Sequence, residues 1–212
     1  MSKLLIGLAG LLLTGCYSTT VFVSSSYDLV PRGRVERQPD PWYEARPFLE
    51  LNPHLVVSFN RVPGRHLKPD YESCESSMDD SLHIQMYSDQ GYQLDLSKTV
   101  AKVNGKSFHI ANYRPYGTEE PSTVRAADYI KVGLIKDGFS DFRQNINKDF
   151  NKTYDQYVNR REVYGAVLIF DEKFSCGEEN FELDVWFNSL ATNSPEKYTI
   201  YFFPWKRAVT PR

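Results

Sequence analysis

Acidic side chains gather around two cysteines, and carboxylates in such numbers are groups that hold calcium or meet a basic protein surface. If the thiols of Cys74 and Cys176 join, two acidic segments come together as one patch. The acidic residues of this predicted patch are Asp70, Glu72, Glu75, Asp79, Asp80, Asp171, Glu172, Glu178 and Glu179. Ca²⁺ takes six to eight oxygen ligands, whereas a basic partner is held by charge complementarity. Since no Asp-x-Asp-x-Asp-Gly loop is present, the leading expectation is a solvated acidic rim, with Ca²⁺ or a basic partner as the alternative.

The sequence offers no recognisable catalytic or metal-binding motif. It contains no Gly-x-Ser-x-Gly elbow, no His-Glu-x-x-His pair and no glycine-rich phosphate loop. His54, His66, His83 and His109 fall on separate predicted elements, and none has a second His or Cys at ligand spacing. We therefore assign no catalytic residue, no metal ligand and no cofactor beyond the calcium alternative. A triad assembled from distant residues stays open, because triads are recognised by geometry.

The first sixteen residues read MSKLLIGLAGLLLTGC. Lys3 precedes an uncharged run that ends in Leu13-Thr14-Gly15, directly before Cys16. This segment resembles the signal peptide of bacterial lipoproteins, in which the cysteine after a Leu-x-Gly-type box becomes the lipid-bearing N-terminus. The apolar run is too short to span about 30 Å of hydrocarbon, which takes roughly 20 helical residues.

The resemblance implies a cell-envelope address for the mature chain. Residues 1–15 would be removed, the Cys16 thiol would carry a diacylglycerol, and its amine a further acyl chain such as palmitate. Two or more acyl chains give stable anchoring to a membrane. In this class an Asp after the cysteine retains the protein at the inner membrane, so Tyr17 indicates the outer membrane if the source is Gram-negative, with the periplasmic face expected and the cell surface as the alternative.

An oxidising periplasm also favours a disulfide between Cys74 and Cys176, the two cysteines left once Cys16 carries lipid. Closing so long a loop stabilises the fold by roughly 4–5 kcal/mol in the chain-entropy model. The alternative is two unpaired thiols. The net charge of −2 argues against a dedicated nucleic-acid binder.

The predicted organisation is a signal peptide over 1–15, a lipidated N-terminus and flexible tether over 16–47, and one globular domain over 48–212. Polar and proline-rich composition supports the tether, with Pro31, Pro39, Pro41 and Pro47 as its prolines. Val21-Phe22-Val23 is the exception, since it could pair as an edge strand.

Within the domain the hydrophobic residues recur with a period of two, which is typical of strands. Asn104-Gly105 separates two such runs and predicts a hairpin with Ala101 opposite Phe108 and Val100 opposite His109. Residues 163–170 are apolar on both faces and predict a central strand. Phe181, Leu183, Val185 and Phe187 alternate with Glu182, Asp184, Trp186 and Asn188. We expect residues 163–170, 181–187 and 198–203 to form an antiparallel meander.

One segment follows a helical period instead. Six residues recur at spacings of three and four and predict one helix over about 140–158 with a core-facing stripe. They are Phe139, Phe142, Ile146, Phe150, Tyr154 and Tyr157.

The sequence thus predicts a mainly β fold, an antiparallel β-sandwich-like domain of about eight or nine strands with one packed α-helix. The alternative is an α+β arrangement of a single sheet plus that helix. We expect a lipid-anchored, non-enzymatic binding, adaptor or structural module that meets another envelope protein. The alternatives are a periplasmic inhibitor or immunity-type lipoprotein and an envelope hydrolase with a dispersed site.

Overall fold

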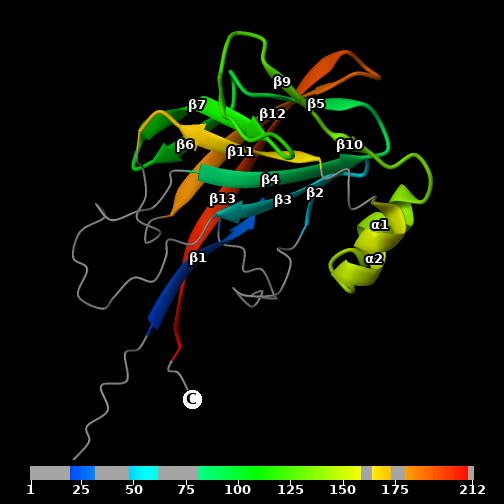
Figure 1. Cartoon of the computed structure of the whole chain (residues 1–212), viewed down its shortest axis with the longest axis horizontal. Coiled ribbons are helices and arrows are strands. Elements are labelled where there is room, and N and C mark those ends of the chain that lie inside the picture. The colour runs from blue at the N-terminus through cyan, green and yellow to red at the C-terminus, as the bar shows by residue number, and fades with distance from the viewer. Residues whose placement is uncertain (1–19, 32–47, 62–80, 159–163, 173–179, 210–212) are drawn as a thin grey trace, which may run out of the picture.

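The computed structural model describes residues 20–31, 48–61, 81–158, 164–172 and 180–209, and these form one curved, mainly antiparallel sheet with two short helices (Figure 1). The predicted mainly β class is confirmed. The strands are β1 (Thr20–Asp28), β2 (Leu49–Asn52), β3 (Leu55–Arg61), β4 (Ser81–Ser88), β5 (Tyr92–Asp95), β6 (Val100–Val103), β7 (Lys106–Pro115), β8 (Ser122–Thr123), β9 (Tyr129–Lys131), β10 (Gly133–Leu134), β11 (Gly165–Phe170), β12 (Phe181–Ser189) and β13 (Ser194–Val209).

The strand order makes the sheet nearly barrel-shaped. Its main path runs β1-β13-β12-β6-β7-β11-β4-β3-β2. The long strand β7 pairs with β6 through its first half and with β11 through its second, so it belongs to both halves of the sheet. The two ends of the path then meet, because the Tyr27 hydroxyl on β1 accepts the Phe59 N–H of β3 at 2.9 Å. Strands outnumber the prediction because pieces of two to four residues, such as β8 and β10, pair at the margins.

The Asn104-Gly105 turn has the predicted geometry. Both residues have positive φ, 50° and 81°, as a type I′ turn requires. The register is also as predicted, with Val100 opposite His109 and Ala101 opposite Phe108. A two-residue turn fixes register by itself, so this part of the sheet is specified locally.

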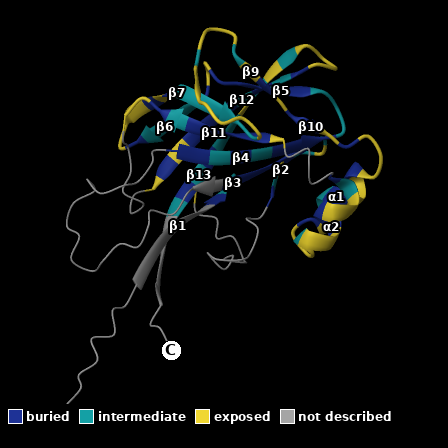
Figure 2. Cartoon of the chain, viewed as in Figure 1, coloured by how far each residue is buried: buried dark blue, intermediate teal, exposed yellow. Residues whose placement is uncertain are grey.

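Many residues of the curved sheet are buried (Figure 2), and apolar side chains among them form the main core. Leu55, Ile84, Leu168, Leu183 and Phe187 are each 0% exposed and come from both halves of the sheet. On β12, Leu183, Val185 and Phe187 lie in this core while Glu182 is exposed, as their alternation predicts.

A second hydrophobic cluster lies between the outer face of β3–β4 and the helices α1 (Phe139–Asn145) and α2 (Phe150–Tyr157). The six residues of the predicted stripe all belong to it. The single predicted helix is wrong, because the chain breaks between the two helices. There the Asn147 side chain accepts the Phe48 N–H and donates to the Phe48 carbonyl. Asp149 then caps α2 by accepting the Lys152 N–H.

Two further predictions need correction. The flexible tether over 16–47 is wrong for Thr20–Asp28, which form β1 and pair with β13 over their whole length, as the Val21-Phe22-Val23 alternative anticipated. The meander is wrong at its first step. Strand β11 is central as predicted, but it lies between β7 and β4, and the strand beside β12 in its place is β6. Alternation identifies a strand without identifying its neighbours.

Candidate functional site

Most residues of the predicted acidic patch, the two cysteines that would join it and the proposed lipid-bearing cysteine lie outside the described residues. These are Cys16, Cys74, Cys176, Asp70, Glu72, Glu75, Asp79, Asp80, Glu178 and Glu179. The disulfide, the lipid attachment and the patch as a whole therefore stay predictions.

Asp171 and Glu172 are described, and both contact the β6–β7 hairpin. The Asp171 backbone N–H donates to the His109 carbonyl at 2.8 Å, and its carboxylate accepts the His109 N–H at 3.0 Å. The Glu172 carboxylate forms an exposed ion pair with Lys106. The structure thus brings these two acids together at the end of β11, where each has a local partner.

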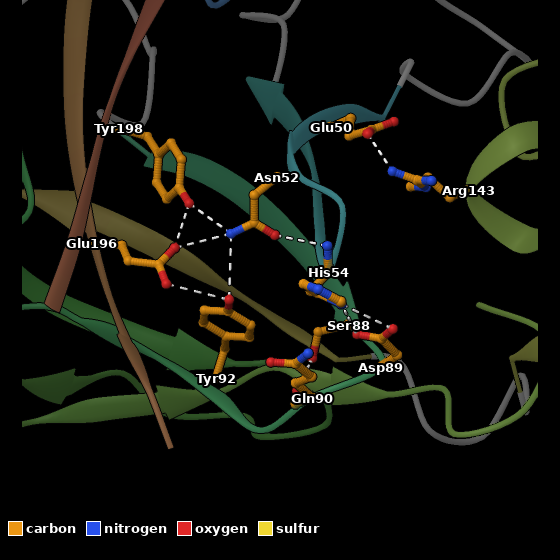
Figure 3. Close-up of polar contacts among 10 residues, drawn as sticks. All are labelled: Glu50, Asn52, His54, Ser88, Asp89, Gln90, Tyr92, Arg143, Glu196 and Tyr198. Carbon is orange, nitrogen blue, oxygen red and sulfur yellow. Dashed lines mark hydrogen bonds and ion pairs between the residues drawn. The ribbon is translucent and has the colours of Figure 1, made fainter. Parts of the chain in front are cut away.

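Polar side chains meet at the rim of the sheet, where β2 approaches β13 (Figure 3). The Asn52 amide N–H₂ lies 2.9 Å from the Glu196 carboxylate, 2.7 Å from the Tyr198 hydroxyl and 3.3 Å from the Tyr92 hydroxyl. The Tyr198 hydroxyl also donates to Glu196. The Asn52 carbonyl oxygen accepts the His54 N–H at 2.8 Å. We call Asn52, Tyr92, Glu196 and Tyr198 the rim cluster.

The rim cluster is suited to joining strands. Burial and the hydrogen bond to Glu196 raise the pKa of Tyr198, and burial, reinforced by the Glu196 charge and opposed by the Asn52 hydrogen bond, raises the pKa of Tyr92. Both phenols are therefore neutral donors at physiological pH. Because Asn52 is on β2 and Glu196 on β13, their bond links strands near opposite ends of the sheet path.

A serine, a histidine and an aspartate also lie close together beside this cluster, but not as a triad. The His54 Nδ1 atom lies 3.1 Å from the Asp89 carboxylate. The Ser88 hydroxyl is directed elsewhere, since it donates to the Gln90 carbonyl and the residue is 0% exposed. A hydroxyl committed to a backbone carbonyl and closed to substrate is not positioned as a nucleophile.

The outer face of β6, β12 and β13 carries the most distinctive arrangement of charge. The Asp184 carboxylate lies 2.7 Å from the Lys102 Nζ, 2.9 Å from the Lys197 Nζ and 2.7 Å from the Thr199 hydroxyl, which donates to it. The Asp184 side chain is 7% exposed, whereas Lys102 and Lys197 are 42% and 40% exposed. The carboxylate is thus covered by two ammonium groups that still reach water.

Trp186 extends this face. Its half-buried ring lies directly opposite Lys197 on β13, and the Lys98 Nζ lies 5.7 Å from the ring centroid, within the range of a cation–π contact. We call Lys98, Lys102, Asp184, Trp186 and Lys197 the lysine–tryptophan face. The Lys98 Nζ also pairs with the Asp95 carboxylate at 3.2 Å, and exposed Glu182 lies directly opposite Lys102, so lysines and carboxylates alternate across this rigid strand scaffold.

The ion pairs favour the charged forms of Asp184 and Lys102 on this face. Burial raises the pKa of Asp184, but hydrogen bonds from Lys102, Thr199 and Lys197 outweigh it, so the net pKa lies below the ordinary value. The hydrogen bond to Asp184 and its charge raise the pKa of Lys102. Asp184 is therefore ionised and Lys102 protonated across the physiological range.

Sequence reasoning did not identify the lysine–tryptophan face as a site. One signal was present, since Trp186 falls in the outward row of β12 between Asp184 and Asn188. Lys102 and Lys197 are 95 residues apart in the sequence, and only the pairing of β6 and β13 with the two sides of β12 brings them together.

Neither a metal centre nor a membrane-crossing helix is found in the part of the chain that the structure describes. No three His, Cys, Asp or Glu side chains there are grouped to hold a metal ion. None of the helices there has the length and apolar character needed to cross a membrane. Comparisons with protein-family models, curated proteins and solved structures find no match for this chain.

Proposed function

We propose that this protein is a lipid-anchored, non-enzymatic binding module of the cell envelope, and that it holds another envelope protein against the lysine–tryptophan face. The anchor is proposed from the signal-like segment that ends in Cys16. In a Gram-negative cell the absence of Asp after this cysteine favours the outer membrane, on its periplasmic side.

The observation that carries the binding role is the half-buried Trp186 among three lysines on a rigid sheet. Tryptophan is enriched among the residues that contribute most to protein interfaces. Exposed charges around such an anchor steer association and fix orientation. The partner surface that this face suits has an apolar recess for the indole, with carboxylates placed to meet the exposed lysines and a basic group placed to meet Glu182.

The packing of the molecule supports a binding role over chemistry inside it. Apolar side chains from both halves of the sheet fill its concave side, and the rim cluster uses its polar groups to join strands. Contacts with a partner therefore fall to the outer faces and the loops.

The test is site-specific photo-crosslinking in intact cells with the full-length protein. A photoreactive amino acid replaces exposed Glu182, which adjoins the face, or exposed Lys152 on α2 as the control position. We expect one discrete adduct from position 182 and none from position 152. Mass spectrometry of the adduct identifies the partner, and a toxin or hydrolase partner would favour the inhibitor alternative.

A matched pair of charge changes gives the second arm. Lys102→Gln with Lys197→Gln should abolish the adduct, whereas Lys148→Gln with Lys152→Gln, the same change in net charge, should leave it intact. Trp186→Leu should abolish it without altering charge. Adducts of equal intensity in all variants, or the same adduct from both positions, would refute the proposed face.

A further inference from the structure

Strands β1 and β13 leave the body of the sheet together as a two-stranded ribbon (Figure 1). They pair from Thr20 with Val209 to Asp28 with Tyr201. At the inner end of the ribbon Tyr27 and Phe202 are each 1% exposed and their ring centroids lie 5.6 Å apart in the main core. The outer end is the pair of Thr20 and Val209.

This outer end is close in sequence to the proposed lipid attachment. Only Tyr17, Ser18 and Thr19 separate Cys16 from Thr20. A fully extended chain covers at most about 3.6 Å per residue, so Thr20 lies within about 14 Å of the acylated residue. A tether of thirty residues would instead allow excursions of about 100 Å.

The outer half of the ribbon, between its midpoint at Trp205 and the pair of Thr20 and Val209, carries residues that favour a membrane surface. Trp205, Lys206 and Arg207 pair with Ser24, Val23 and Phe22. Tryptophan is enriched at the boundary between lipid and water. Lysine and arginine near an anionic leaflet each gain about 1 kcal/mol from its surface potential.

We propose that the outer half of the β1–β13 ribbon, from Trp205 to Val209 and from Thr20 to Ser24, docks on anionic phospholipid headgroups beside the acyl chains. This inference rests on the lipid anchor of the proposed function. The ribbon then acts as a short rigid support. Tyr27 is three residues from Ser24, so at about 3.4 Å per residue roughly 10 Å of ribbon separates the docked half from the body of the sheet.

The experiment uses the full-length acylated protein, reconstituted in vesicles that contain brominated lipids as fluorescence quenchers. In one variant Trp42→Phe and Trp186→Phe leave Trp205 as the sole tryptophan. In the matched control Trp42→Phe and Trp205→Phe leave Trp186. Trp186 is opposite Lys197, eight residues along β13 from Trp205, or about 27 Å.

We expect Trp205 to lose emission in brominated phosphatidylglycerol vesicles and Trp186 to keep it. The loss should shrink in vesicles of brominated phosphatidylcholine, and it should shrink in phosphatidylglycerol when Lys206→Gln and Arg207→Gln are added. An acylated protein with unquenched Trp205, or with quenching that neither headgroup charge nor these substitutions alter, would overturn the docking proposal and leave the anchor intact. Mass spectrometry showing an unacylated N-terminus would overturn the anchor, and the docking proposal with it.

Discussion

At the scale of single residues, Asp184 shows how a buried carboxylate is kept ionised on an outer face. Two exposed lysines and a threonine hydroxyl replace the water that the carboxylate loses. Charge-assisted bonds of this kind are stronger than neutral ones, and their net effect on stability is reduced because the lysines remain solvated.

The substitution Asp184→Asn should therefore lower the free energy of unfolding by about 1 kcal/mol at pH 7. The folded pKa of Asp184 lies below its ordinary 3.8, so its contribution is complete above that value and is lost as pH falls through the folded pKa. Urea denaturation of both proteins from pH 7 to pH 2.5 should show the two stabilities converging in acid.

The exposed neighbour on β12 provides the control for this prediction. Glu182→Gln should change stability by less than about 0.5 kcal/mol at any pH. If the difference in free energy of unfolding between wild type and Asp184→Asn did not change with pH, the ion pairs would not be what lowers the pKa of Asp184.

At the scale of elements, strand β11 depends on a glycine at its first residue. A Cβ on Gly165 would lie 2.1 Å from the Ile84 carbonyl oxygen and 2.6 Å from the Tyr116 ring. The carbonyl belongs to the backbone of β4 and cannot rotate away as a flexible side chain can. Close packing at this point therefore fixes how β11 enters the sheet.

Gly165→Ala should reduce the free energy of unfolding by about 3 kcal/mol, because overpacking displaces a backbone strand. Gly105→Ala is the comparison, since nothing lies within 4 Å of a Cβ there and only the φ of +81° opposes the change. That strain costs about 1 kcal/mol. Thermal or urea unfolding that ranks Gly105→Ala as the more damaging substitution would contradict the close-approach argument.

The elements that could be predicted from sequence are those specified by their own residues. The Asn104-Gly105 hairpin has its turn type and register encoded in two adjacent residues, and the aromatic stripe of the helices is encoded in its spacing. The break between α1 and α2 was not predictable in this way, because Asn147 leaves the helix to bond Phe48, which lies far away in sequence.

The candidate site was less predictable for the same reason. The outward position of Trp186 follows from alternation along β12. Whether Lys102 and Lys197 lie near it depends on which strands flank β12. The expected meander assigned β11 to one of those places, and the β6–β7 hairpin occupies it instead.

At the scale of the whole molecule, two hydrophobic clusters share β3 and β4. Val57 and Met86 belong to the main core, whereas Val56 and Tyr87 on the opposite face belong to the cluster under the helices. Phe142 is 0% exposed in that second cluster, and its ring lies 6.0 Å from the Phe48 ring. The helices are thus attached to a sheet that has its own core.

Phe142→Ala should cost about 4 kcal/mol of stabilising free energy from packing. We expect the helices to open locally while the sheet stays folded. In native-state hydrogen exchange, we expect the amides of α1 and α2 to lose protection while those of β12 keep theirs. Phe187→Ala, in the main core, should lower protection in both regions. Equal loss across sheet and helices in Phe142→Ala would indicate a single cooperative unit.

The pairing of β1 with β13 also determines when the sheet can be completed during synthesis. The ribosome releases β1 long before β13, so β1 lacks its partner strand until synthesis is almost complete. During that interval its backbone N–H and C=O groups have no strand to pair with, a condition that invites aggregation. Contacts so distant in sequence also form slowly. The nascent chain would therefore benefit from a holding chaperone until its final strand emerges.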